Sequence, residues 1–355
     1  MSRATAKSPW VASPPLDLLL IAFGWLIAYL PLALIDAQFA AERNVRLYNA
    51  RIQWVILAVL LVNYVHRHYT FLLVYGDRAE FHKHKSAYVI WPLVAVAVTA
   101  LSVQLSFFTV LAGISVAWTI YHTIAQKFGI LRVYGGKAGY GKRWIDLGFV
   151  WSGLLLVVLV VFARERTGIL AQYAFGRRAI QLLEPLLPIL PWLRDLAAAL
   201  FAAFVGLFAV EEIRNRQRLS LGRVAFAISI LALYALFLRS LITAYIVFGF
   251  SHALEYVVFV NAFVRSKYRR LPENHSPVAR AVRRYWVVVP TVTLLLALFS
   301  YGGLRWDAKW FGVYIVGSSF LHFIYDGLIW KVRKPDVARP LEVALAPTGD
   351  RSPLA

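Results

Sequence analysis

Five of the eight histidines lie inside apolar stretches, where ionisable side chains are costly and therefore indicate a function. Four of them have a polar residue three or four positions away, on the same face of a helix. These pairs are His66 with Asn63, His122 with Gln126, His252 with Glu255, and His322 with Asp326. Imidazoles and carboxylates without thiolates suit non-haem iron, zinc or manganese. The pattern predicts a metal centre within apolar helices.

The four histidines of these pairs are the predicted metal ligands, and iron is the metal that we expect. Glu255 and Asp326 are expected either to bind the metal directly or to accept hydrogen bonds that orient the imidazole rings. Tyr121 and Tyr256 lie beside two of the pairs, where a phenol can donate a hydrogen bond or line a substrate pocket. We expect catalysis to involve these two carboxylates and two tyrosines.

Further polar side chains are expected to surround the ligands without being the main ones: Asn63, Arg67, His68 and Gln126. For His68, which is off the helix face of His66, a ligand role and a packing role are equally compatible with the sequence. Arg67 is predicted to pair with one of the two carboxylates or to extend towards the inner headgroups. Lys127 lies near the predicted end of its helix, so its charge is expected to reach those headgroups too.

Three histidines and one glycine-rich segment carry no predicted chemistry. The three histidines outside the apolar stretches are interpreted as solvated loop residues: His82, His84 and His275. Residues 136–143 have the glycine and lysine spacing of a phosphate-binding loop. However, Arg143 replaces the Ser or Thr that would bind Mg²⁺, and no strand precedes the segment. A flexible basic loop is expected there.

The elements that must position these residues are apolar runs long enough to span a bilayer as helices. The chain is 60% hydrophobic and 16% charged, against about 45–50% and about 25% in soluble domains. We predict an all-α polytopic membrane bundle with about ten spans, at residues 16–35, 52–75, 87–104, 107–130, 145–163, 196–212, 223–239, 242–264, 286–303 and 309–330. Two longer apolar runs are divided at residues 102–106 and near Arg239.

Basic residues predict the orientation of these spans. With the N-terminus in the cytoplasm, 25 of the 38 Lys and Arg residues fall on the inner side, so both termini are predicted to be cytoplasmic. The four spans with the paired histidines then all run inwards. Each histidine precedes the first basic residue of the next inner segment by 9 to 13 positions. At about 1.5 Å per residue, the imidazoles lie within about 6 Å of one another in depth.

Composition limits the remaining possibilities. The net charge of +20 is explained by topology and by contact with anionic membrane lipids, so no nucleic-acid partner is expected. The absence of cysteine excludes disulfides, thiolate ligands and iron–sulfur clusters. Residues 1–333 are predicted to form one transmembrane domain, and residues 334–355 a disordered cytoplasmic tail. Residues 164–195 are expected to hold a short amphipathic element on the outer face.

The stretch HFIYD at residues 322–326 resembles the bacterial Brp/Blh-type β-carotene dioxygenases, which are helical membrane proteins with histidines on several spans. In that family a His is followed four or five residues later by Asp. The chain lacks the family's Pro-His-Gly segment, and it also lacks the HxxxH and HxxHH motifs of membrane desaturases and hydroxylases. The resemblance implies non-haem iron, a lipid-like or isoprenoid substrate and a bacterial inner membrane.

The sequence therefore predicts a membrane-embedded, metal-dependent oxidoreductase that acts on an apolar small molecule entering from the bilayer. One alternative is a proton-coupled transporter that uses the same His, Glu and Asp side chains as a relay. Another is a membrane cytochrome that binds haem between paired histidines. The least specific alternative is a scaffold with a buried polar network. Metal content, pH-dependent flux and the visible absorption spectrum distinguish these hypotheses.

Overall fold

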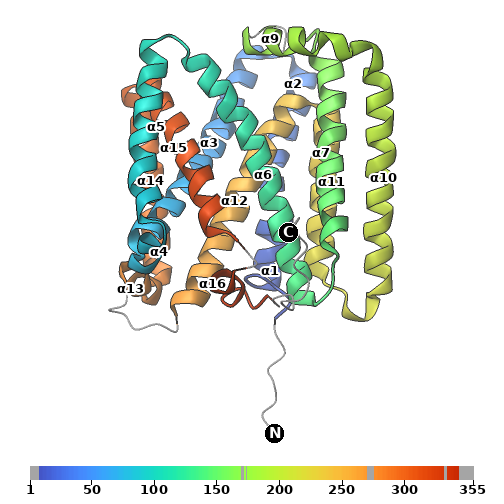
Figure 1. Cartoon of the computed structure of the whole chain (residues 1–355). Coiled ribbons are helices and arrows are strands. Elements are labelled where there is room, and N and C mark those ends of the chain that lie inside the picture. Colours follow the sequence, from blue (N-terminus) through green and yellow to red (C-terminus); the bar gives the residue numbers. More distant parts are fainter. Residues whose placement is uncertain (1–7, 169–171, 173, 270–275, 332–333, 344–355) are drawn as a thin grey trace.

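The computed structural model describes residues 8–168, 172, 174–269, 276–331 and 334–343. Every regular element in this part of the chain is helical, and the long helices stand side by side as an all-α bundle (Figure 1). The elements are α1 (Pro14–Leu16), η1 (Asp17–Ala22), α2 (Leu26–Glu42), α3 (Val45–Gly76), α4 (Arg78–Lys83), α5 (Lys85–Gln104), α6 (Phe108–Ala138), α7 (Arg143–Glu165), α9 (Ala174–Leu183), η2 (Glu184–Ile189), α10 (Leu190–Arg214), η3 (Arg216–Arg218), α11 (Leu221–Arg239), α12 (Leu241–Tyr268), α13 (Pro277–Arg283), α14 (Tyr285–Trp306), α15 (Ala308–Ile329) and α16 (Pro335–Ala338).

Nine of the described helices are long and apolar enough to cross a membrane, and a bent pair makes a tenth possible span. The pair consists of Pro14–Ala22 and Leu26–Ala41, which meet at 46°. A Cβ atom on Gly24, at this bend, would lie 2.6 Å from Leu254 of α12, so glycine allows the close approach. The predicted multi-pass helical fold is confirmed, and so are the divisions between α5 and α6 and between α11 and α12. The side of the membrane on which the termini lie stays a prediction.

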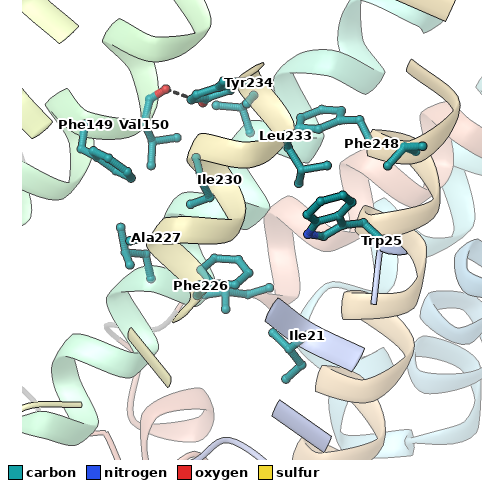
Figure 2. Packing of buried hydrophobic residues seen from close by; sticks show 14 of the residues in the cluster. Ile21, Trp25, Phe149, Val150, Phe226, Ala227, Ile230, Leu233, Tyr234 and Phe248 are labelled. Atoms are coloured by element: carbon teal, nitrogen blue, oxygen red, sulfur yellow. Dashed lines mark hydrogen bonds between the residues drawn. The ribbon is translucent and has the colours of Figure 1, made fainter. Parts of the chain in front are cut away.

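The larger apolar core surrounds α11 (Figure 2). Ile230 and Leu233 of α11 are almost fully buried, at 0% and 1% exposure. Figure 2 shows the same helix facing Phe149 on one side and Trp25 on the other. The Tyr234 hydroxyl donates a hydrogen bond to the backbone oxygen of Val150 at 2.6 Å, which joins α11 to α7.

Buried ion pairs also join α11 to α7. Arg223 of α11 is fully buried and forms ion pairs with Asp146 of α7 at 2.6 Å and with Glu212 of α10 at 2.7 Å. Arg132 of α6 lies 2.6 Å from the other oxygen of Asp146. Buried charges persist only when they are paired in this way, so the network fixes four helices relative to one another.

The two ends of the bundle differ (Figure 1). At one end α9 lies across the long helices, where an amphipathic element was predicted within residues 164–195. At the other end lie α1, α4, α13 and α16. The disorder predicted from residue 334 is wrong for residues 334–343, because Val337 and Leu341 are buried at 5% and 4% exposure. Residues 344–355 lie outside the described residues.

Asp77 fixes the junction between α3 and α4. Its carboxylate caps α4 by accepting hydrogen bonds from the backbone nitrogens of Ala79 and Glu80, and it also accepts from Tyr268 and Lys267 of α12. Burial alone would raise the pKa of Asp77. The hydrogen bond from Tyr268 and the charge of Lys267 outweigh it, so the pKa lies below its ordinary value.

The Asp77→Asn variant is therefore expected to lose about 1–2 kcal/mol of stability at pH 7, since it weakens a helix cap and removes an ion pair. A carboxyl group with a lowered pKa stabilises the fold above its unfolded-state pKa of about 3.9, and this contribution is lost as the pH falls through the folded value. The difference between the two proteins should thus shrink below about pH 4. Thermal unfolding in detergent from pH 3 to pH 7 measures it. A difference that does not change with pH would contradict this assignment.

Candidate metal centre

Four imidazoles meet inside the bundle: His66 of α3, His122 of α6, His252 of α12 and His322 of α15. In the order His66, His252, His122, His322 and back, neighbouring ring centroids are 4.9, 5.0, 4.9 and 4.9 Å apart. The centroids of His252 and His322 are 6.3 Å apart. The predicted convergence of the four imidazoles from four separate helices is therefore confirmed, whereas their depth in the membrane stays a prediction. We call these four residues the histidine cluster.

Unpartnered nitrogens distinguish the histidine cluster from an ordinary buried polar network. Five of its ring nitrogens are buried without a hydrogen-bond partner: Nδ1 and Nε2 of His66, Nε2 of His122, Nδ1 of His252 and Nε2 of His322. Buried polar atoms in folded proteins are almost always hydrogen-bonded, and each exception costs about 1–3 kcal/mol. Five such atoms on four adjoining helices give the cluster nitrogens that could hold a metal ion.

Two overlapping sets of side chains have the spacing of metal ligands. His66, His252 and His322 each offer one nitrogen, and these three atoms lie within 4.8 Å of one another. A second set with the same spread consists of His122, His322 and Asp326. Ligand atoms about 2.0–2.2 Å from one metal lie at most about 4.4 Å apart. Small rotations of the side chains would therefore bring the atoms of either set within bonding distance of one metal ion. His322 belongs to both.

Asp326 and His322 are held in place by two hydroxyl groups. Thr70 and Tyr256 each donate a hydrogen bond to Oδ1 of Asp326, at 2.9 and 2.8 Å. The Thr70 oxygen also lies 2.8 Å from Nδ1 of His322. The Thr70 hydroxyl also contacts the Tyr256 hydroxyl, which already donates to the carboxylate. When the Thr70 proton goes to the carboxylate, Nδ1 of His322 carries the imidazole proton and donates it to Thr70. Nε2 of His322 is then the unprotonated nitrogen that a metal requires.

The site residues that the sequence did not reveal are Thr70 and Trp330. The indole nitrogen of Trp330 donates to the Tyr256 hydroxyl at 3.2 Å, and it thereby orients the phenol whose proton goes to Asp326. Thr70 follows His66 by four positions, and Trp330 follows Asp326 by four. A search for hydroxyl and indole groups at that spacing, and not only for carboxylates and amides, could have found them.

Glu255 takes part in neither ligand set, because its carboxylate is engaged elsewhere. Nζ of Lys127 lies 2.6 Å from Oε1 of Glu255, and both side chains are fully buried. Ser251 donates to the same oxygen at 2.5 Å, and Gln126 lies 3.4 Å from the other. The predicted extension of Lys127 to the headgroups is wrong. The reason is that α6 continues to Ala138, which places Lys127 well inside the helix.

Two predicted site residues face away from the histidine cluster. Tyr121 is 56% exposed and its ring packs against Trp151, so the structure does not support its predicted catalytic role. His68 uses both ring nitrogens in other contacts, with the backbone oxygen of Tyr64 and with the hydroxyl of Tyr314, each at 2.5 Å. For His68, the packing interpretation is the one that the structure favours.

Of the remaining predicted neighbours of the metal ligands, one lies beside the histidine cluster and two have other partners. Gln126 donates to the backbone oxygen of His252 at 3.0 Å and so does lie beside the cluster. Asn63 bonds within its own helix, to the backbone oxygen of Val59. The ion pair predicted between Arg67 and a carboxylate is absent from the described residues, and the guanidinium donates instead to the backbone oxygen of Ile315 at 3.0 Å.

The segments predicted to lie outside the site do so where they are described. His82 is an exposed residue of α4, and His84 follows at the junction with α5. His275 lies outside the described residues. The glycine- and lysine-containing segment at residues 136–143 is partly helical, since α6 continues to Ala138 before the backbone turns at Gly139, where φ is 75°.

The fold and the site together define a multi-pass, all-α membrane protein with a buried His/Asp cluster that could hold a metal ion. Comparisons with protein-family models, with curated proteins and with solved structures find no match.

Proposed function

We propose that the chain is a membrane-embedded, metal-dependent oxidoreductase whose metal is bound by the histidine cluster and Asp326. The observation that carries the proposal is the set of five buried, unpartnered imidazole nitrogens. Neutral imidazoles with one carboxylate, and no thiolate in the chain, are the ligands of non-haem iron, and zinc or manganese can use them too. Bound iron would supply oxygen activation.

An apolar groove beside the site supports a lipid-like substrate. It encloses about 230 Å³ between α3, α12, α13 and α14, and its lining includes Tyr69, Val260 and Val289. Tyr69 and Val260 pack in one cluster with Tyr256, whose ring centroid is 5.2 Å from that of His322. Tyr256 therefore packs close to both the groove and the histidine cluster, which puts an apolar groove near the proposed metal site.

The geometry favours this proposal over its alternatives. A haem bound by two of the histidines would place its macrocycle between them, where the other two rings lie at centroid separations of 4.9–5.0 Å. A proton relay through Glu255 would have to break its buried ion pair with Lys127. The relay also predicts pH-driven flux and no bound metal, so one measurement separates it from the enzyme.

The metal content of the purified protein tests the proposal. We expect a stoichiometric transition metal in the wild type, with iron as the leading candidate, and loss of that metal in His322→Ala, which removes the residue common to both ligand sets. The exposed His82→Ala serves as the control and should retain it, because His82 lies on α4, outside both ligand sets. Elemental analysis after extensive dialysis measures the result. Wild-type protein without metal, or His322→Ala with an unchanged amount, would reject the proposed function.

A further inference from the structure

Arg67 is a cation inside a membrane-spanning helix that has no carboxylate partner in the described part of the chain. Of its five N–H donors, Nη1 donates to the backbone oxygen of Ile315, whereas Nε is buried without a partner. The Ile315 oxygen also accepts from Ser318 at 3.1 Å and from Ser319 at 2.7 Å. These hydroxyls already satisfy the two lone pairs of that oxygen, so the carbonyl does not require Arg67.

The charge balance of the site leaves Arg67 available to an anion. Lys127 and Glu255 neutralise each other, and the imidazoles are neutral as metal ligands. The charges of Arg67 and Asp326 then sum to zero, although the two side chains do not form an ion pair. A bound divalent ion adds two positive charges. Because uncompensated charge in a bilayer core is costly, the loaded site favours a negatively charged ligand.

The surroundings of Arg67 suit the polar end of an apolar molecule. Its guanidinium carbon lies 5.3 Å from the ring centroid of Tyr64, and the charge also acts on Tyr245 of α12 and Tyr314 of α15. Tyr64 is buried, but Tyr245 and Tyr314 are each 39% exposed. The cation thus lies against one buried aromatic ring and near two tyrosines that are partly exposed.

Depth identifies the kind of molecule that can reach this position. Arg67 lies nine residues before the end of α3, which is about 14 Å at about 1.5 Å per residue. Arg67 thus lies well inside the span predicted at residues 52–75, on its inner half. The phosphate of a phospholipid stays at the membrane surface. A free single-chain amphiphile can enter more deeply when its charge is paired.

We propose that Arg67 binds the anionic head group, in the simplest case a carboxylate, of the apolar substrate. This inference rests on the proposed function and names its substrate class. A guanidinium can hold a carboxylate through two parallel hydrogen bonds, which fixes the orientation of the bound molecule. Arg67 directly follows His66, about 100° around α3, so a charged end bound there lies on the neighbouring face of that helix and limits which part of the chain can reach the metal.

Binding of a fluorescent fatty acid tests the assignment. The full-length protein in phosphatidylcholine nanodiscs is titrated with cis-parinaric acid and, separately, with its uncharged methyl ester. The wild type should bind the acid about tenfold or more tightly than the ester, as a charge-assisted hydrogen bond implies. Arg67→Gln should bind the two equally. Arg67→Lys should keep part of the preference, because the charge remains while the paired geometry is lost.

Arg164→Gln is the matched control, since Arg164 also donates to backbone oxygens, those of Leu238 and Phe237. It should keep the full preference for the acid. Equal binding of acid and ester by the wild type would overturn the proposal, as would a preference that survives in Arg67→Gln. If Arg67→Gln does not fold, the ratio in Arg67→Lys decides, and a ratio equal to that of the wild type overturns it.

Two further measurements distinguish the carboxylate site from related explanations. Competition by phosphatidylglycerol in the nanodiscs would assign the anion to a phospholipid phosphate and would overturn the carboxylate assignment. Metal is measured on the same samples. Metal-free protein that still prefers the acid through Arg67 would refute the proposed function but support the anion site. Metal-loaded protein that does not prefer the acid would refute only the anion site.

Discussion

Replacing His322 with alanine is expected to reduce metal affinity by more than about hundredfold. Replacing a residue that only orients a ligand typically reduces it by about 10–100-fold. His322 is the one residue common to both ligand sets. Its Nε2 is buried without a partner, and Thr70 fixes its Nδ1 at 2.8 Å. The variant therefore removes a ligand whose ring is already held in place. Metal content and metal-dependent thermal stabilisation of the purified protein measure the loss.

The comparison with His68→Ala makes this prediction specific. His68 is also a buried histidine within a membrane-spanning helix, but both of its ring nitrogens have protein partners. We expect His68→Ala to keep its metal. Thr70→Val keeps the shape of Thr70 but removes its hydroxyl, and it should weaken binding by about 10–100-fold. Equal metal loss in the His68 and His322 variants, or none in either, would contradict the assignment.

The sequence was sufficient to predict the helical architecture and the meeting of the four imidazoles, because both depend on distance along the chain. Span length follows from bilayer thickness, and depth follows from the constant rise per residue of a helix. Counting from each histidine to the next basic segment therefore identified residues on four separate helices whose ring centroids prove to lie about 5 Å apart.

Pairings across helices could not be predicted in the same way, because they depend on how each helix is rotated about its axis. Glu255 and Asp326 have equivalent places in the sequence, yet one contacts Lys127 and the other contacts Thr70 and Tyr256. Residue spacing places a side chain on a helix face but does not state which neighbour that face meets.

Errors in helix length had a further effect on the predicted partners. The fourth span was expected to end near residue 130, which made Lys127 a terminal residue that could extend to the headgroups. The helix instead continues to Ala138, and the ammonium group is buried inside the bundle, where it needs an anionic partner. Glu255 supplies it. Glu255, which the sequence indicated as a ligand, is thus the ion-pair partner of Lys127, which the sequence placed outside the site.

The variant Lys127→Met is expected to lose about 3–5 kcal/mol of unfolding free energy, because it leaves the charge of Glu255 buried and unpaired. Both side chains are fully buried, and the ion pair joins α6 to α12, two of the helices that carry the histidine cluster. Reversible unfolding in mixed micelles of dodecyl maltoside and sodium dodecyl sulfate measures the change. A loss below about 1 kcal/mol, the range of exposed ion pairs, would contradict the buried pairing.

The double variant Lys127→Met/Glu255→Gln separates stability from metal binding. It removes both charges and keeps an acceptor for Ser251, so most of the lost stability should return, since replacing a whole buried ion pair with neutral groups is often tolerated. Its metal content should equal that of the wild type, because Glu255 belongs to neither ligand set. If the double variant regains stability but loses its metal, Glu255 is a ligand as the sequence predicted, and Lys127 holds its carboxylate ready for the ion. If it keeps both, the ion pair only supports the helices that position the histidine cluster.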